Sequence, residues 1–126
     1  MELYVNPGDE LPLYRQIVRQ VTDAIAGGRL KPGERLSSHR DLAAELVIAP
    51  LTVKKAYDEL EHVGLIETRR GRGTFVCLQL PAPDEDKKRE RLRDPAQRLL
   101  SQAALSGVPF TEVLNLLREI RKGMKS

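Results

Sequence analysis

The sequence predicts a mainly α protein: a winged helix-turn-helix domain with a small β-hairpin wing, followed by a C-terminal two-helix segment. Two short segments of helical periodicity, 38–47 and 50–63, meet at a tight turn. Two β-rich runs then flank the basic, glycine-containing stretch 69–73, as in a wing hairpin. Aromatic residues make up only 4% of the chain, which favours helices over a large sheet. We expect a winged helix at 1–78, a linker at 79–86 and a helical hairpin at 87–126.

The N-terminal part is expected to hold one helix between two short strands. The run 3–5 is a candidate edge strand, and Pro12 opens a helix that ends at Gly27-Gly28. The helix should pack across the helix-turn-helix as its third member. Residues 35–36 are expected to form a short strand that the wing hairpin joins.

The two helices of the predicted helix-turn-helix have clear start signals in the sequence. Ser38 can cap the first helix, with Asp41 three residues later, and Pro50 suits the first turn of the second. Buried stripes are predicted at Leu42, Ala43 and Leu46 of the first helix and at Val53, Ala56, Tyr57, Leu60 and Val63 of the second. Val47 stands in the turn, and we expect the turn to avoid positive φ there because Val is β-branched.

The outward face of the second helix begins with Leu51, which has Lys54 and Lys55 to either side and Thr52 on one flank. After Gly64, strands are expected at 65–68 and 74–77, and the three arginines between them predict a phosphate-seeking tip. Cys77, at the end of the second strand, is expected to be buried.

The C-terminal part predicts a helical hairpin after a linker with two prolines. One helix from about 85 to 106 is expected to bend at Pro95, although a later start at Asp94 is the alternative, and a second helix should span 109–122. So small a unit cannot bury enough surface alone, so we expect self-association rather than packing on the winged helix. The residues assigned to dimerisation are Leu92, Leu99, Leu100, Ala103, Val113, Leu114, Leu117 and Ile120.

Composition excludes several other classes of protein. The net charge of +3 arises entirely from residues 81–126, so the placement of the cations rather than their number argues for DNA binding. The single Cys, the lack of a signal peptide and the lack of a long apolar run predict a cytoplasmic protein that does not enter a membrane. Two separated histidines and the lack of a catalytic or nucleotide-binding motif predict no enzyme, no metal site and no cofactor.

Several runs resemble the DNA-binding domain of GntR-type bacterial transcription regulators. These are 12–17, 30–36, Arg40-Asp-Leu-Ala, Thr52-Val-Lys-Lys-Ala-Tyr-Asp-Glu-Leu and 64–76, and the short helical remainder resembles the YtrA branch of that family. The resemblance implies DNA contacts from Arg40, Thr52 and Lys54, and from a wing tip of Arg70, Gly71 and Arg72 that enters the minor groove. Lys55 joins them because it points outward as squarely as Lys54.

The sequence departs from the family pattern at the starts of both helices of the helix-turn-helix and in the turn between them. Ser37 and His39 replace a proline and a small apolar residue, and Val47 replaces a glycine. Ala49 and Leu51 stand where polar or basic side chains are frequent, so direct base reading there is expected to be apolar.

These observations predict a dimeric transcription regulator, a repressor of a palindromic operator in double-stranded DNA. The alternative is a winged-helix protein-protein adaptor without sequence-specific DNA binding, but an adaptor does not need cations on both reading elements. A small-molecule effector of unknown identity is compatible with the first reading. Its site should involve the homodimer interface, because one hairpin is too small to enclose a pocket.

Overall fold

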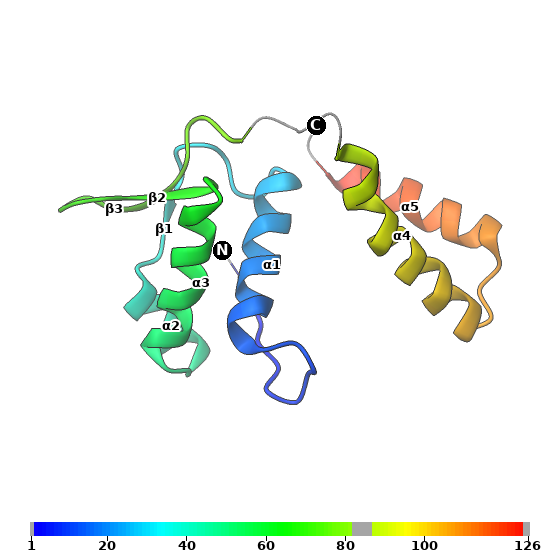
Figure 1. Ribbon diagram of the computed structural model, residues 1–126, viewed down its shortest axis with the longest axis horizontal. Coiled ribbons are helices and arrows are strands. Elements are labelled where there is room, and N and C mark those ends of the chain that lie inside the picture. The colour runs from blue at the N-terminus through cyan, green and yellow to red at the C-terminus, as the bar shows by residue number, and fades with distance from the viewer. Residues whose placement is uncertain (1, 82–86, 125–126) are drawn as a thin grey trace. The chain divides into compact units, whose positions relative to one another are not determined.

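The computed structural model describes residues 2–81 and 87–124, so most of the predicted linker, 82–86, lies outside the described residues. The chain forms two compact units, residues 1–81 and 82–125. The first unit contains α1 (Leu13–Ala26), β1 (Arg35–Leu36), α2 (His39–Leu46), α3 (Pro50–His62), β2 (Ile66–Arg69) and β3 (Gly73–Val76), and the second contains α4 (Lys88–Leu105) and α5 (Phe110–Gly123) (Figure 1). The predicted fold class is confirmed.

The core of the first unit lies between three helices and a small sheet. Both α1 and α2 pack against α3, so α1 is the third member of the helix-turn-helix, as predicted. The sheet is antiparallel in the order β1-β3-β2, with Leu36 opposite Thr74 and Ile66 opposite Val76. The largest fully buried side chains come from all three helices and both long strands: Ile17, Val21, Leu42, Val53, Leu60, Ile66 and Val76.

The start signals of the reading helices work as the sequence predicts. The Ser38 hydroxyl accepts a hydrogen bond of 3.1 Å from the Asp41 amide, and Pro50 stands in the first turn of α3. The predicted burial of Val63 is wrong because α3 ends at His62, so Val63 is its C-cap and is 50% exposed. Leu46 is half-buried against the core instead of fully buried.

The expectation for Val47 is also wrong, because this residue adopts the left-handed conformation with φ 57° and ψ 51°. The conformation lets the amide of Ile48 donate to the Ala43 carbonyl at 3.0 Å, which closes the C-terminus of α2. A non-glycine residue pays roughly 1–2 kcal/mol for this conformation. The helix-end hydrogen bonds therefore override the preference of the side chain.

The described part of the segment before α1, residues 2–12, contains no strand, contrary to the candidate at 3–5. Two glutamine side chains of α1 take the place of a pairing strand. Gln20 accepts from the Tyr4 amide at 3.0 Å and donates to the Tyr4 carbonyl at 2.6 Å, while Gln16 accepts from the Asn6 amide at 2.8 Å. These bonds hold the buried side chain of Leu3 against the core.

The second unit is an antiparallel pair of helices. As predicted, α4 begins before Pro95 and continues through it. Gly107, with φ 68°, lies in the turn before α5. Val113 is the only large apolar side chain of this unit that is fully buried among the described residues. In the two described ranges, no helix is both long enough and apolar enough to span a bilayer.

Candidate nucleic-acid interface

The recognition helix α3 presents an outward face that combines one exposed apolar residue with two cations. Leu51 is 77% exposed, and Lys54 and Lys55 are also exposed, whereas Thr52 is half-buried. The opposite face buries Val53, Ala56, Tyr57 and Leu60. The helical periodicity of the sequence therefore separates the face that packs from the face that is free to enter a major groove.

The two lysines of this face are held differently. The Lys54 ammonium lies 3.0 Å from a carboxylate oxygen of Asp58, one turn further along α3. The Lys55 ammonium lies 4.0 Å from the centroid of the Tyr14 ring on α1. Both lysines are exposed, so a phosphate can compete for either of them at small cost.

Tyr57 fixes the recognition helix to the start of α2. Its hydroxyl donates a hydrogen bond of 2.8 Å to the Ser37 carbonyl, and its side chain is buried in the core. Burial raises the pKa of this hydroxyl well above its ordinary value, so the group stays protonated and remains a donor. Arg40, exposed in the first turn of α2, is thereby kept in a fixed relation to α3.

The wing turn leaves two arginines and one glycine exposed at its tip. The Arg72 amide donates to the Arg69 carbonyl at 2.9 Å, and Gly71 at the third position of this turn has φ 76°. No heavy atom lies within 4 Å of the position that a Gly71 side chain would take. Arg70 and Arg72 flank this open backbone, so the tip can approach a narrow groove closely.

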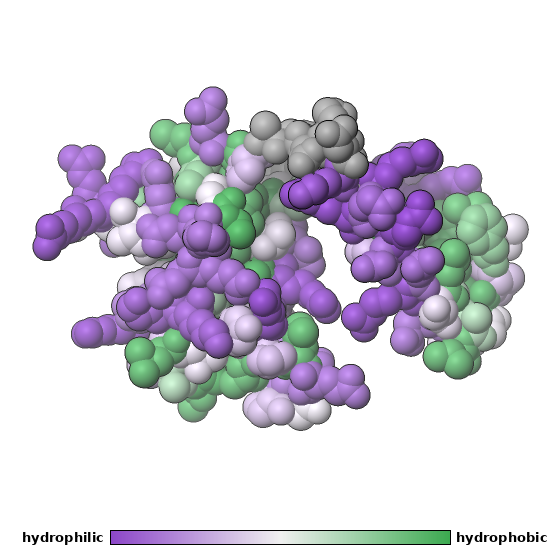
Figure 2. Space-filling view, viewed as in Figure 1, coloured by the Kyte–Doolittle hydropathy of each residue, from purple (hydrophilic) through white to green (hydrophobic). Residues whose placement is uncertain are grey.

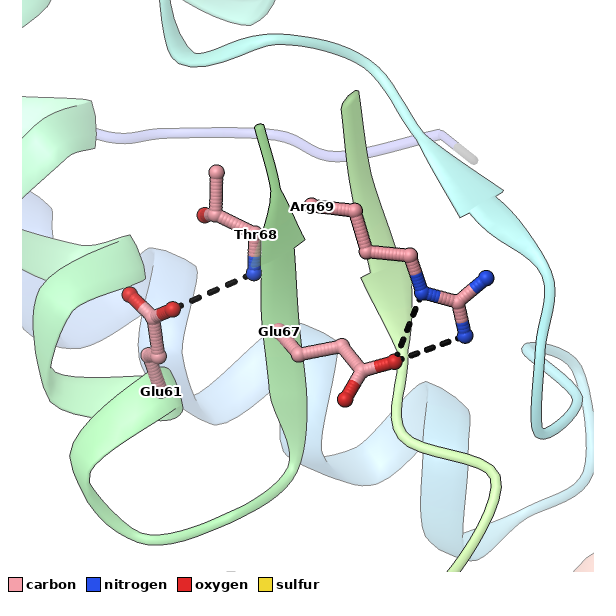
Figure 3. Close-up of polar contacts among 4 residues, drawn as sticks. All are labelled: Glu61, Glu67, Thr68 and Arg69. Carbon is pink, nitrogen blue, oxygen red and sulfur yellow. Dashed lines mark hydrogen bonds and ion pairs between the residues drawn. The ribbon is translucent and has the colours of Figure 1, made fainter. Parts of the chain in front are cut away.

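Arg69 does not belong to the exposed tip, which corrects the prediction of three phosphate-seeking arginines. Its Nε and Nη2 atoms donate to one carboxylate oxygen of Glu67 at 2.9 and 2.7 Å, as Figure 3 shows. Its guanidinium also stacks at 4.6 Å from the centroid of the Phe75 ring. These contacts hold the Arg69 side chain against its neighbours and stiffen the base of the wing.

Carboxylates of α3 connect the recognition helix to its neighbours, which the sequence did not reveal. Glu61 accepts a hydrogen bond of 3.1 Å from the Thr68 amide on the edge strand β2 (Figure 3). Glu59 pairs with Arg15 of α1 at 2.8 Å. Only the four-residue spacing of Lys54 and Asp58 is visible in the sequence, because the other partners are distant along the chain.

Two remaining features considered from the sequence are a possible metal site and the single cysteine. Within residues 2–81 and 87–124, no three His, Cys, Asp or Glu side chains gather closely enough to hold a metal ion. Cys77 follows β3 and is half-buried instead of buried, and this partial burial raises the pKa of its thiol.

Comparison with known proteins agrees with this geometry. Residues 13–76 match the family described as "Bacterial regulatory proteins, gntR family". The chain is 33% identical over 123 residues to the HTH-type transcriptional repressor YtrA of Bacillus subtilis (strain 168), with 98% of this chain and 95% of that relative covered. The similarity to the short YtrA branch is thus confirmed.

Solved structures show the same fold. A transcriptional antiterminator from Listeria monocytogenes EGD-e has a TM-score of 0.72 and 32% identity, covering 94% of this chain and 89% of that chain. The DNA-binding domain of AraR in complex with operator ORX1 has a TM-score of 0.52 and 28% identity, covering 60% of this chain and 93% of that chain. The protein therefore belongs to the gntR family of bacterial regulatory proteins, and it is a winged helix-turn-helix DNA-binding transcription regulator and not an enzyme.

Proposed function

We propose that this regulator is a cytoplasmic homodimeric repressor that occupies a palindromic operator. In this proposal residues 1–78 read DNA, residues 87–126 pair two protomers, and residues 79–86 link the two parts. The observation that carries the dimer is the exposed apolar surface of the α4–α5 hairpin. The YtrA relative is named a repressor, which supports repression rather than activation by this protein.

The hairpin leaves several large apolar side chains exposed on both of its helices. Leu92 is 68% exposed, Leu100 47%, Leu117 44% and Ile120 52%. A second copy of the same hairpin would cover these side chains and complete a four-helix core. The proposed dimer residues are Leu92, Leu99, Leu100, Ala103, Val113, Leu114, Leu117 and Ile120, of which Val113 acts within one hairpin because it is already buried.

A two-fold dimer would place two copies of the reading surface on two half-sites of one operator. We assign the DNA contacts to Arg40, Thr52, Lys54, Lys55, Arg70, Gly71 and Arg72. The residues of α2 and α3 would act in and beside the major groove, with Thr52 on a phosphate and Lys54 on a phosphate or guanine edge. Arg70 and Arg72 would enter the minor groove, where the potential attracts arginine and Gly71 permits close approach.

A small-molecule effector would bind where two hairpins meet. One hairpin contributes an open groove of about 470 Å³ along α4, lined by Arg89, Leu92, Arg93, Ala96, Gln97 and Leu100. An open groove of one protomer becomes an enclosed site only when a partner covers it. The dimer interface is therefore the place where an effector could change DNA binding.

Selection of bound fragments from a pool of random duplexes tests this function. The full chain should recover a single inverted repeat, and sedimentation of the complex should give two protomers for each duplex. Recovery of a single asymmetric site bound by one protomer would contradict the dimeric, palindromic reading. The same selection with the Arg70→Ala and Arg72→Ala double variant is the control for non-specific capture.

A further inference from the structure

The point where α2 meets α3 carries an apolar patch on the reading head of the regulator. The patch consists of Val47, Ala49 and Leu51, and Val47 is 88% exposed while Leu51 is 77% exposed. Figure 2 shows hydrophobic side chains gathered at the end of the first unit formed by α2 and α3, among hydrophilic neighbours. The exposed cations Arg40 and Lys54 stand on the same two helices.

Neither of the two large side chains in the patch serves the core. The buried face of α3 consists of Val53, Ala56, Tyr57 and Leu60, and Leu51 points away from it. Val47 occupies a left-handed position that glycine would fill without strain, yet its side chain is almost fully in solvent. Packing in the monomer therefore explains neither a leucine nor a valine at these positions.

The chemistry of the major groove suggests an occupant for this patch. Leu51 and Val47 have no side-chain group that can donate to or accept from a base edge. The C5-methyl group of thymine is the one apolar group that base pairs present in the major groove, and apolar side chains contact it in specific complexes. Cations on both helices favour the approach of this surface to the negatively charged backbone of DNA.

We propose that Leu51, with Val47 beside it in the turn, reads thymine methyl groups in the operator. The regulator would then select thymines at the base pairs that face the beginning of α3. Specificity there would come from apolar contact, while Arg40 and Lys54 hold the register on the backbone. The inference rests on the proposed operator binding and names the bases that this part of the surface selects.

Replacement of single thymines by deoxyuridine in the selected operator tests the inference. The replacement removes only the methyl group and keeps every hydrogen-bonding atom of the base pair. At thymines that face α3, the affinity of the unaltered protein should fall about fourfold, the loss expected for one buried methyl group. Thymines elsewhere in the same duplex serve as matched controls and should tolerate the replacement.

Variants of the protein complete the test. Leu51→Ala should weaken operator binding and lose the sensitivity to deoxyuridine. Val47→Gly should bind the operator more weakly while unfolding at a higher temperature, because glycine removes the backbone strain together with the side chain. A merely structural role would move stability and affinity in the same direction.

The outcomes separate the two proposals. If no operator is recovered, both operator reading and methyl reading fail. If an inverted repeat is recovered but deoxyuridine never changes the affinity of the unaltered protein, only the methyl reading is overturned. Equal sensitivity of Leu51→Ala and the unaltered protein would likewise remove Leu51 from base reading.

Discussion

The Tyr57 hydroxyl of the recognition helix donates a 2.8 Å hydrogen bond to the carbonyl of Ser37, the residue just before the cap of α2. This partly buried bond joins α3 to the start of α2. The angle between them is therefore fixed by a polar contact as well as by the apolar core. In the proposed complex, α2 and α3 must keep this relation so that Arg40 and Lys54 can contact the same duplex.

Tyr57→Phe should destabilise the protein by about 1–3 kcal/mol, because it leaves the Ser37 carbonyl without its buried donor. Urea denaturation of the full chain measures this free energy of unfolding. Tyr4→Phe is the matched control, because Tyr4 is 75% exposed and should show almost no change. Equal effects of the two substitutions would mean that the Tyr57 bond contributes nothing specific.

Replacing Arg70 and Arg72 together by Ala should weaken DNA binding without lowering the unfolding temperature. Two lost phosphate-region contacts should also reduce the slope of log affinity against log salt by about 1.8. Arg69→Ala is the informative comparison, because Arg69 contacts Glu67 and Phe75. Its removal should make the wing less stiff but should change the salt slope little. An unchanged slope in the double variant would remove the wing from the DNA contacts.

Asp58→Asn should strengthen DNA binding roughly twofold. The exposed pair between Asp58 and Lys54, worth about 0.3–0.5 kcal/mol at this helical spacing, competes with DNA for the lysine. Fluorescence anisotropy with the selected operator can resolve this change. Glu119→Gln on α5 is the control for a simple loss of one negative charge, and an equal gain from that variant would argue against the competition.

Leu117→Glu with Ile120→Glu should yield a monomer whose first unit remains folded. The two charges would enter the proposed apolar interface, where they have no partners. Analytical ultracentrifugation gives the oligomeric state, and circular dichroism reports the fold. Leu105→Glu is the control, because Leu105 is 83% exposed and lies outside the proposed dimer set. A dimer that survives the double substitution would show that α5 is not in the interface.

Local signals allowed most of the fold to be predicted from the sequence. Ser38 and Pro50 mark helix starts through hydrogen bonding and backbone geometry that depend on neighbouring residues alone. The outward position of Leu51 follows from helical periodicity. Such features can be read from a few consecutive residues.

The errors arose where specific hydrogen bonds and side-chain contacts decide the outcome. Val47 accepts a left-handed conformation because the Ile48 amide then donates to the Ala43 carbonyl and closes the end of α2. Arg69 leaves the predicted tip because Glu67 and Phe75 of the same hairpin contact its guanidinium. Lys55 is exposed, as predicted, but the sequence did not indicate its contact with Tyr14, forty-one positions earlier in the chain. No local pattern reports these tertiary partners.

The most direct test of the central claim is a titration of the full chain with the selected operator and with a scrambled duplex at several salt concentrations. We expect a dimer to bind the operator at least about a thousandfold more tightly than the scrambled duplex at physiological salt, and both affinities to fall as salt rises. Equal, weak binding of both duplexes that disappears at high salt would contradict sequence-specific DNA binding.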